Sequence, residues 1–280
     1  MNPLEINDTV IFERTVTVNG HNIYYRAAGE SHSKTVLLLH AIASDSSQWL
    51  QNISALAEHF RVIAPDLIGF GQSDKPQSTY TVRSLVSFLH DFTQHIGVEP
   101  VTLVGQSLGA AIALHYALAH PSKVNRIVNV SGGYGYRLPD VENVDKLGFA
   151  SGSLQLLNPT SGEKARQLLS LIIHDQQVAQ SNEVVDLLIS SAQLSSEANQ
   201  SLIESFARRE DGLDNKLNSL VSPTLIIWGR DDKLTPLSLG ERFQREIPNS
   251  RLMAIERCAH APYIEQVEQF NQAVIHFLKD

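Results

Sequence analysis

The chain has 280 residues, of which 42% are hydrophobic and 19% charged, and its formal net charge is −8. This length and composition are typical of a globular protein with a sizeable core, and they exclude a largely disordered chain. The acidic balance, with no basic tract, makes nucleic acid and anionic membrane surfaces poor partners.

Cysteine usage and segment hydropathy narrow the class of protein further. Cys258 is the one cysteine, so the chain cannot form an internal disulfide. The first residues do not show a cationic start followed by an apolar run, and no stretch reaches the roughly 18 apolar residues of a membrane helix. We therefore expect a cytoplasmic protein that does not insert into a membrane.

The N-terminal region predicts a β-hairpin. Residues 14–18 and 22–27 alternate in polarity on either side of Asn19-Gly20. An Asn-Gly pair between alternating segments is the strongest short-range signal for a hairpin turn.

Four short apolar runs follow the hairpin, and they lie at 35–40, 61–66, 101–105 and 126–131. Continuous apolar runs of this length are typical of strands buried on both faces, as in a parallel sheet covered by helices. Residues 81–98 carry an apolar stripe at helical spacing that stops at Gly97. The alternation of strands and helices predicts an open α/β sheet.

The pattern changes after Ser131. No strand is predicted between about residue 132 and residue 215, and three helices are expected there, at 163–173, 183–194 and 196–209. Buried-strand patterns return at 224–229 and 251–256, and an amphipathic helix closes the chain.

The domain organisation follows from this break in the pattern. We predict one α/β core that comprises residues 1–131 and 216–280. A helical cap, inserted at 132–215, is expected to cover one end of the sheet.

A Gly-Gln-Ser-Leu-Gly segment at 105–109 joins a predicted buried strand to an alanine-rich helix. A sharp strand-to-helix turn needs flanking residues with almost no side chain, and it lifts the central hydroxyl above the sheet. We interpret Ser107 as a candidate nucleophile, with the backbone N–H of Leu108 aimed at an oxyanion that forms there. The alternative is a chance match in an ordinary turn.

A serine hydroxyl needs a base and a group that orients the base, because it is a weak nucleophile at neutral pH. After such an elbow, the expected chain order is serine, then an acid, then histidine. Asp231 and Asp232 follow the buried run at 224–229, and His260 precedes the C-terminal helix. These positions lie at the carboxyl ends of predicted strands, where open α/β sheets build their sites. The alternative for His260 is a purely structural role.

The loop that begins at His40 is expected to supply a second oxyanion donor, and the backbone N–H of Ile42 is the candidate. His40 itself is expected to support this loop and not to act as the base. The chain has no histidine or cysteine pattern of a metal site, so neither a metal nor another cofactor is predicted.

Together, these segments resemble the α/β-hydrolase superfamily over nearly the whole chain. The resemblance lies in LLHAIAS, PDLIGFGQSDKP (65–76), GQSLG, WGRDDKLTP and CAHAPYIEQ. It implies a mostly parallel sheet flanked by helices and a Ser-His-Asp triad. It also implies that Asp232 is the acid, because Gly229 and Pro236 match the family spacing around that position. Glu265 occupies the family's acidic position five residues after the histidine.

Two departures from the family pattern affect backbone geometry. Ala41 and Ala259 stand where the family usually has glycine, so the backbone conformation at both positions stays open. The serine at position 107 argues against the epoxide and alkyl-halide hydrolases of this superfamily, which carry aspartate at the elbow.

The inserted segment and the C-terminal segment are similar to hydrolases that cleave carbon–carbon bonds in meta-cleavage products of aromatic degradation. Those enzymes typically carry an arginine in the second cap helix, a tryptophan after the histidine and an asparagine before the serine. Here EVVDLLISSAQ contains no arginine, Ala261 follows the histidine, and Gln106 precedes the serine. The scaffold is therefore similar, while these recognition residues differ.

The sequence favours a carboxylesterase that cleaves small or medium apolar esters through an acyl-enzyme. Gln106, Phe149 and Leu154 are the candidate substrate-binding residues, and a small-molecule ester is the expected partner. The alternative is a C–C bond hydrolase for meta-cleavage products. A third candidate is a ligand-binding member of the fold without catalysis.

Overall fold

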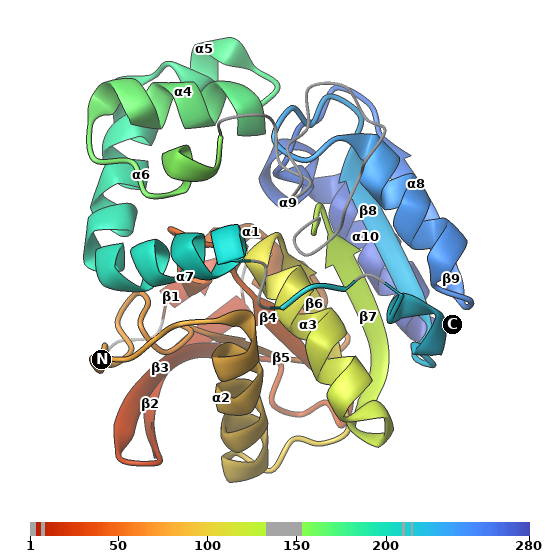
Figure 1. Cartoon of the computed structure of the whole chain (residues 1–280). Helices are drawn as coiled ribbons and strands as arrows, with labels where there is room; N and C mark the ends of the chain where they lie inside the picture. Colours follow the sequence, from red (N-terminus) through yellow and green to blue (C-terminus); the bar gives the residue numbers. More distant parts are fainter. Residues whose placement is uncertain (1–3, 7–8, 133–152, 209–210, 214) are drawn as a thin grey trace.

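A computed structural model describes residues 4–6, 9–132, 153–208, 211–213 and 215–280 of the chain. Its centre is a nine-stranded sheet in the order β1-β2-β3-β5-β4-β6-β7-β8-β9 (Figure 1). The strands are β1 (Leu4–Ile6), β2 (Thr9–Val18), β3 (His21–Ala28), β4 (Thr35–Leu39), β5 (Arg61–Pro65), β6 (Val101–Gln106), β7 (Val124–Val130), β8 (Thr224–Gly229) and β9 (Ser250–Ile255).

The sheet is antiparallel at its N-terminal edge and parallel elsewhere. The pairs β1–β2, β2–β3 and β3–β5 are antiparallel, while every neighbouring pair from β5 through β9 is parallel. Asn19 and Gly20 turn the hairpin between β2 and β3 with φ of 50° and 85°, the left-handed conformation that a tight hairpin turn requires. The α/β architecture expected from the sequence is confirmed.

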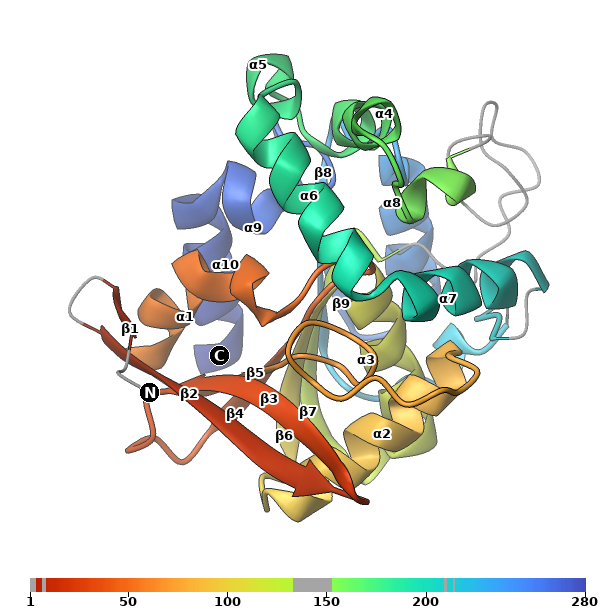
Figure 2. The same cartoon turned by 90° about the vertical axis from the view of Figure 1, so that its left-hand side faces the viewer.

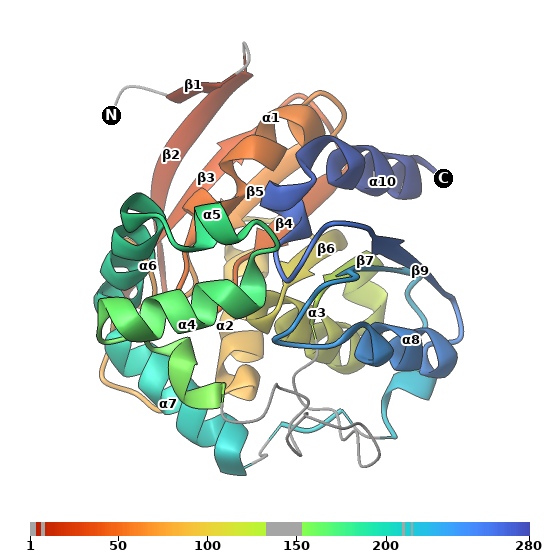
Figure 3. The same ribbon diagram turned by 90° about the horizontal axis from the view of Figure 1, so that it is seen from above.

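Helices cover both faces of the sheet (Figure 3). Along β4, Leu37 and Leu39 pack into the core on one face, whereas Val36 and Leu38 pack into the core on the other. This double burial explains why the parallel strands are continuous apolar runs in the sequence. The first core includes α2 (Val82–His95), α3 (Leu108–Ala119) and α8 (Leu237–Glu246), and the second includes α1 (Leu50–Ala57) and α10 (Val267–Lys279).

A group of helices is inserted between β7 and β8 and lies over one end of the sheet (Figures 1 and 2). These inserted helices are η3 (Leu154–Leu157), α4 (Gly162–Ile172), α5 (Gln176–Ala179), α6 (Asn182–Leu194) and α7 (Ser196–Arg208). The three helices expected from the sequence correspond to α4, α6 and α7, whose ends agree with the expectation to within one residue.

The sequence pattern does not predict helices α1, α5 and α8. All the charged residues of α8 lie at 241–246, and the helix buries only Leu239, Gly240 and Phe243, so its apolar stripe is narrow. No described helix combines the length and the apolar character that crossing a membrane requires.

Candidate active site

The turn between β6 and α3 holds Ser107 in a conformation that residues other than glycine rarely adopt, with φ of 51° and ψ of −108°. A Cβ atom at Gly105 would lie 2.3 Å from the backbone of Gly109, and one at Gly109 would lie 2.1 Å from the carbonyl oxygen of Leu39. The backbone N–H of Ser107 donates to the carbonyl of Val130 on the adjacent strand, at 3.0 Å. The glycines are therefore required by close packing, and the strain is concentrated at the serine.

His260 and Asp232 are joined by a short hydrogen bond. The His260 Nδ1 atom lies 2.7 Å from the Asp232 Oδ2 atom, and both side chains are almost completely buried. Because Nδ1 donates its proton to the carboxylate, Nε2 is left as the acceptor on the other side of the ring. No described residue bonds this buried Nε2 atom.

The Asp232 carboxylate is fixed by donors on every side. Its Oδ1 atom accepts from the backbone N–H groups of Leu234 and Thr235, each at 2.9 Å. Its Oδ2 atom also accepts from the Thr235 hydroxyl at 2.9 Å. Asp231 points elsewhere: its Oδ2 atom lies 2.9 Å from Nδ1 of His174, and its side chain is 44% exposed. The structure thus brings Asp232, and not Asp231, to His260.

Ser107 and His260 line one small cavity of about 130 Å³ between the sheet and the inserted helices. Its polar lining also includes Gln106, whose Nε2 atom donates to the carbonyl oxygen of His260 at 3.1 Å. The rest of the lining is mostly apolar and includes Ala41, Ile42, Ala43, Leu157, Leu168, Ile172, Leu188, Leu234, Ala261 and Tyr263.

Of the three substrate-binding residues expected from the sequence, one lines the cavity. Gln106 lines the cavity. Leu154 is absent from the lining and packs, partly buried, against the hydrophobic core. Phe149 lies outside the described residues.

The loop after β4 begins at His40, which is fully buried and forms hydrogen bonds that support the loop. The His40 Nε2 atom accepts from the backbone N–H of Leu67 at 3.0 Å, and Nδ1 lies 2.7 Å from the carbonyl oxygen of Ala41. Burial lowers the pKa of His40 and so favours the neutral ring. A neutral ring has one donor and one acceptor nitrogen, as these two contacts require. The contacts are those of a supporting residue.

Three consecutive N–H groups in this loop have different partners. The Ala41 N–H donates to Oε1 of Gln48, and the Ala43 N–H donates to Oδ1 of Asn199, each at 3.1 Å. Within the described parts of the chain, the Ile42 N–H has no acceptor, and Ile42 lines the cavity. Leu108 is the first residue of α3, so its N–H has no partner inside the helix. These two N–H groups are the candidate oxyanion donors.

The alanines that replace family glycines cause no strain. Neither Ala41 nor Ala259 has a positive φ, and the left-handed conformation in the first loop falls on Ala43, with φ of 55°. Ala259 is held through its N–H, which donates to Oε1 of Glu265 at 2.9 Å. The ordinary conformation of both alanines explains why glycine is not required there.

Sequence reasoning missed two residues that support this site. Thr235 follows Asp232 by three positions, and this spacing of a hydroxyl after a carboxylate is a local signal for a side-chain-bonded turn. Asn199 is 156 residues away from its partner Ala43, so no local pattern signals that contact.

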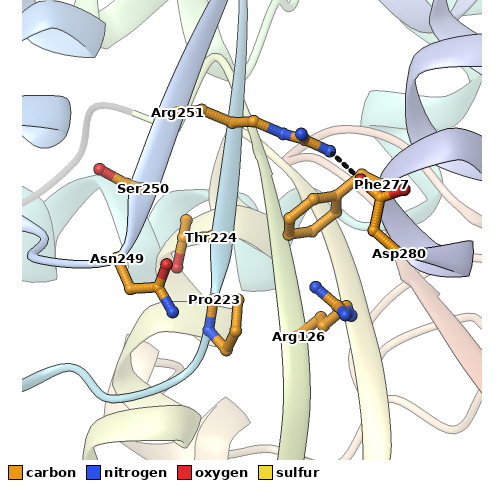
Figure 4. A pocket seen from close by; sticks show the side chains of 8 residues that line it. All are labelled: Arg126, Pro223, Thr224, Asn249, Ser250, Arg251, Phe277 and Asp280. Carbon is orange, nitrogen blue, oxygen red and sulfur yellow. Dashed lines mark hydrogen bonds and ion pairs between the residues drawn. The ribbon is translucent and has the colours of Figure 1, made fainter.

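A larger cavity, of about 350 Å³, lies at the opposite ends of the strands, beside Thr224 and Ser250 at the starts of β8 and β9 (Figure 4). The guanidinium groups of Arg126 and Arg251 lie 5.2 Å and 4.9 Å from the ring centre of Phe277. Arg251 also pairs with Asp280 at 3.2 Å. These contacts tether α10 to the sheet, and the lining holds no serine–histidine pair, so the smaller cavity is the candidate active site.

Comparisons with known proteins agree with this fold. A family model described as "alpha/beta hydrolase fold" matches residues 34–167 and 191–267. A 2-hydroxy-6-oxononadienedioate/2-hydroxy-6-oxononatrienedioate hydrolase from Paraburkholderia phymatum is 29% identical, over 91% of this chain and 90% of that protein.

Two solved structures are similar over most of their length. The meta-cleavage product hydrolase from Pseudomonas fluorescens IP01 has a TM-score of 0.83 and 27% identity, covering 95% of this chain and 97% of that one. A bacterial membrane phospholipase A has a TM-score of 0.83 and 26% identity, covering 96% of this chain and 86% of that one. The chain is therefore a hydrolase, and it belongs to the α/β-hydrolase family.

Proposed function

We propose that this protein is a serine hydrolase in which Ser107 is the nucleophile, His260 the general base and Asp232 the acid that orients the base. The observation that carries the proposal is the His260 ring: one nitrogen is bonded to a buried carboxylate, and the other is unbonded beside the cavity that Ser107 lines. This tautomer is the one that accepts a serine proton.

The reaction begins when Ser107 adds to a substrate carbonyl and passes its proton to His260. The backbone N–H groups of Ile42 and Leu108 stabilise the tetrahedral oxyanion, and Asp232 stabilises the imidazolium. His260 then protonates the leaving group, and a water molecule activated by the same ring hydrolyses the acyl-enzyme. No metal or cofactor takes part in this scheme.

The proposed substrate is a conjugated oxo acid of the meta-cleavage class, cleaved at the carbon–carbon bond next to its ketone. The support is the likeness to two hydrolases named for such substrates, at 29% and 27% identity with at least 90% of each chain covered. The leaving carbon keeps the bonding electron pair, which its conjugated carbonyl delocalises, and takes a proton from His260. Water supplies the hydroxyl of the released acid, so the atoms balance.

Ester hydrolysis by the same triad is the second candidate. Among its described lining residues, the cavity has no lysine or arginine to pair with a substrate carboxylate, and most of the lining is apolar. The phospholipase A structure, with a TM-score of 0.83, indicates that a closely similar scaffold cleaves esters. We further propose that residues 132–215 act as a cap that shapes this cavity.

The experiment compares purified wild type and Ser107→Ala on two substrate sets. One set is p-nitrophenyl esters from acetate to palmitate, and the other is a phenyl-substituted meta-cleavage dienoate followed by loss of its visible absorbance. Dienoate turnover that exceeds ester turnover and disappears in Ser107→Ala is expected. Ester turnover alone would favour the second candidate, and the absence of labelling by a fluorophosphonate probe would refute the serine hydrolase.

A further inference from the structure

The inserted helices contact both halves of the proposed catalytic machinery through hydrogen bonds. On one side, the backbone N–H of His260 donates to the carbonyl of Ile172, at the end of α4, at 3.0 Å. On the other side, Asn199 in α7 accepts the N–H of Ala43 in the loop after β4, at 3.1 Å. Helix α7 is the inserted helix that lies nearest the sheet in Figure 1.

The Asn199 amide is fully engaged and cannot rotate freely. The side chain is buried, with no exposed surface. Its Nδ2 atom donates to the carbonyl of Ala192 at 3.2 Å and lies 3.4 Å from Oδ1 of Asn158, while its Oδ1 atom accepts from Ala43. A flipped amide would place the NH₂ group against an N–H donor and the oxygen against a carbonyl, so the network defines one orientation.

The contact falls at the strained point of the loop. Ala43 has a φ of 55°, a conformation that alanine leaves readily unless its surroundings hold it. The Ala41 N–H donates to Gln48, which belongs to the α/β core, and the Ala43 N–H donates to Asn199, which belongs to the inserted helices. Between these two anchors lies Ile42, which lines the cavity and whose N–H has no acceptor among the described residues.

We infer that Asn199 is a positioning residue for the reaction, because it fixes the loop conformation that presents the Ile42 N–H to the oxyanion. The inference rests on the proposed serine hydrolase. In this arrangement the inserted helices not only enclose the substrate but also complete the oxyanion-stabilising loop from outside the core.

The test uses Asn199→Leu, which keeps the side-chain volume and removes the acceptor. We expect kcat on the best substrate of the two sets to fall about tenfold with KM changed less than twofold, since a displaced donor loses part of the roughly 10²–10³-fold effect of an oxyanion donor. The inhibition constant of phenylboronic acid, which forms a tetrahedral adduct with serine, is expected to rise by the same factor. Circular dichroism and thermal unfolding check that the variant is folded.

Asn158→Ala is the matched control, because it removes a partner of the same amide without touching the loop. Equal losses in both variants, or an Asn199→Leu enzyme with unchanged kcat and boronate affinity, would overturn the inference. An inactive wild type that no fluorophosphonate labels would instead refute the underlying hydrolase.

A measurement on wild type applies even if Asn199→Leu does not fold. In ¹⁵N-labelled protein, the Ala43 amide is expected to exchange slowly with solvent, while the Ile42 amide exchanges fast and becomes protected when phenylboronic acid binds. An Ala43 amide that exchanges as fast as Ile42 in the free enzyme would contradict the assigned contact.

Discussion

Replacing Asp232 by asparagine tests the orientation of the base. The backbone donors of Leu234 and Thr235 hold one oxygen of this side chain, so Oδ1 of the asparagine stays with them and its NH₂ group faces His260. The ring must then accept at Nδ1 and carry its proton at Nε2, on the side of the cavity. In that tautomer His260 cannot take the proton of Ser107.

The expected loss in kcat for Asp232→Asn is about 10⁴-fold, as for the corresponding tautomer error in other triads. This factor corresponds to about 5 kcal/mol in the activation barrier. The substitution preserves the size of the side chain and its backbone contacts, so we expect the melting temperature to change by only a few degrees. The assay is kcat on the best substrate of the two sets, with the melting temperature measured in parallel.

Asp231→Asn is the matched control, because it makes the same change at the neighbouring residue. Asp231 is 44% exposed and contacts His174, and exposed pairs of this kind contribute little to stability. Its kcat is expected to stay within about threefold of wild type. If Asp231→Asn lost activity and Asp232→Asn kept it, the assignment of the acid and the account of the tautomer would both be wrong.

Three further predictions concern the elbow, the acid and the pH dependence of stability. Gly109→Ala places a Cβ atom 2.1 Å from the Leu39 carbonyl oxygen, so we expect the free energy of unfolding in urea to fall by roughly 3 kcal/mol. The control Gly162→Ala is expected to be tolerated, because its Cβ atom has its nearest neighbour at 3.9 Å. Thr235→Val removes a donor to Asp232, and kcat is expected to fall roughly tenfold without a matching change in KM; an unchanged kcat would show that the hydroxyl does not orient the carboxylate. Burial lowers the pKa of His115 to about 4, so the unfolded chain takes up a proton that the folded protein does not as the pH falls from 6.5 towards 4. Stability is therefore lost over this window, by about 2 kcal/mol between pH 7 and pH 5, and His115→Gln is expected to remove that part of the dependence.

Much of the fold was predictable from the sequence because its signals are local. The parallel strands are apolar on both faces, as the opposite packing of Val36 and Leu37 shows, so each appears as a continuous run. The hairpin was predictable from one Asn-Gly pair, whose two residues adopt the left-handed conformation. Helix α8 was not predictable in the same way, because it buries only Leu239, Gly240 and Phe243 and so carries a short apolar stripe.

The elbow was also predictable, because its pattern of two glycines around a serine lies within five consecutive residues. The Leu39 carbonyl oxygen that excludes a side chain at Gly109 belongs to a distant strand. Gly105 and Gly109 leave space that a side chain would fill, and Ser107 takes the strained conformation between them. The family spacing indicated Asp232 and not Asp231, and in the structure Asp232 is the residue that bonds His260. Its catalytic role stays a prediction until the two asparagine variants are compared.

The sequence by itself determined the features that have local signals. These are the buried strands, the hairpin turn, the helix periodicity and the serine between two glycines. Only the tertiary structure decided which residues from distant segments form contacts. A hydrogen bond between remote segments produces no periodic pattern in the sequence of either segment. In the sequence, Asn199 is one of many polar residues of an amphipathic helix. In the structure, it accepts a hydrogen bond from Ala43, which is 156 residues away. Leu154 is apolar like the residues of the cavity wall, but the folded chain packs it against the core instead.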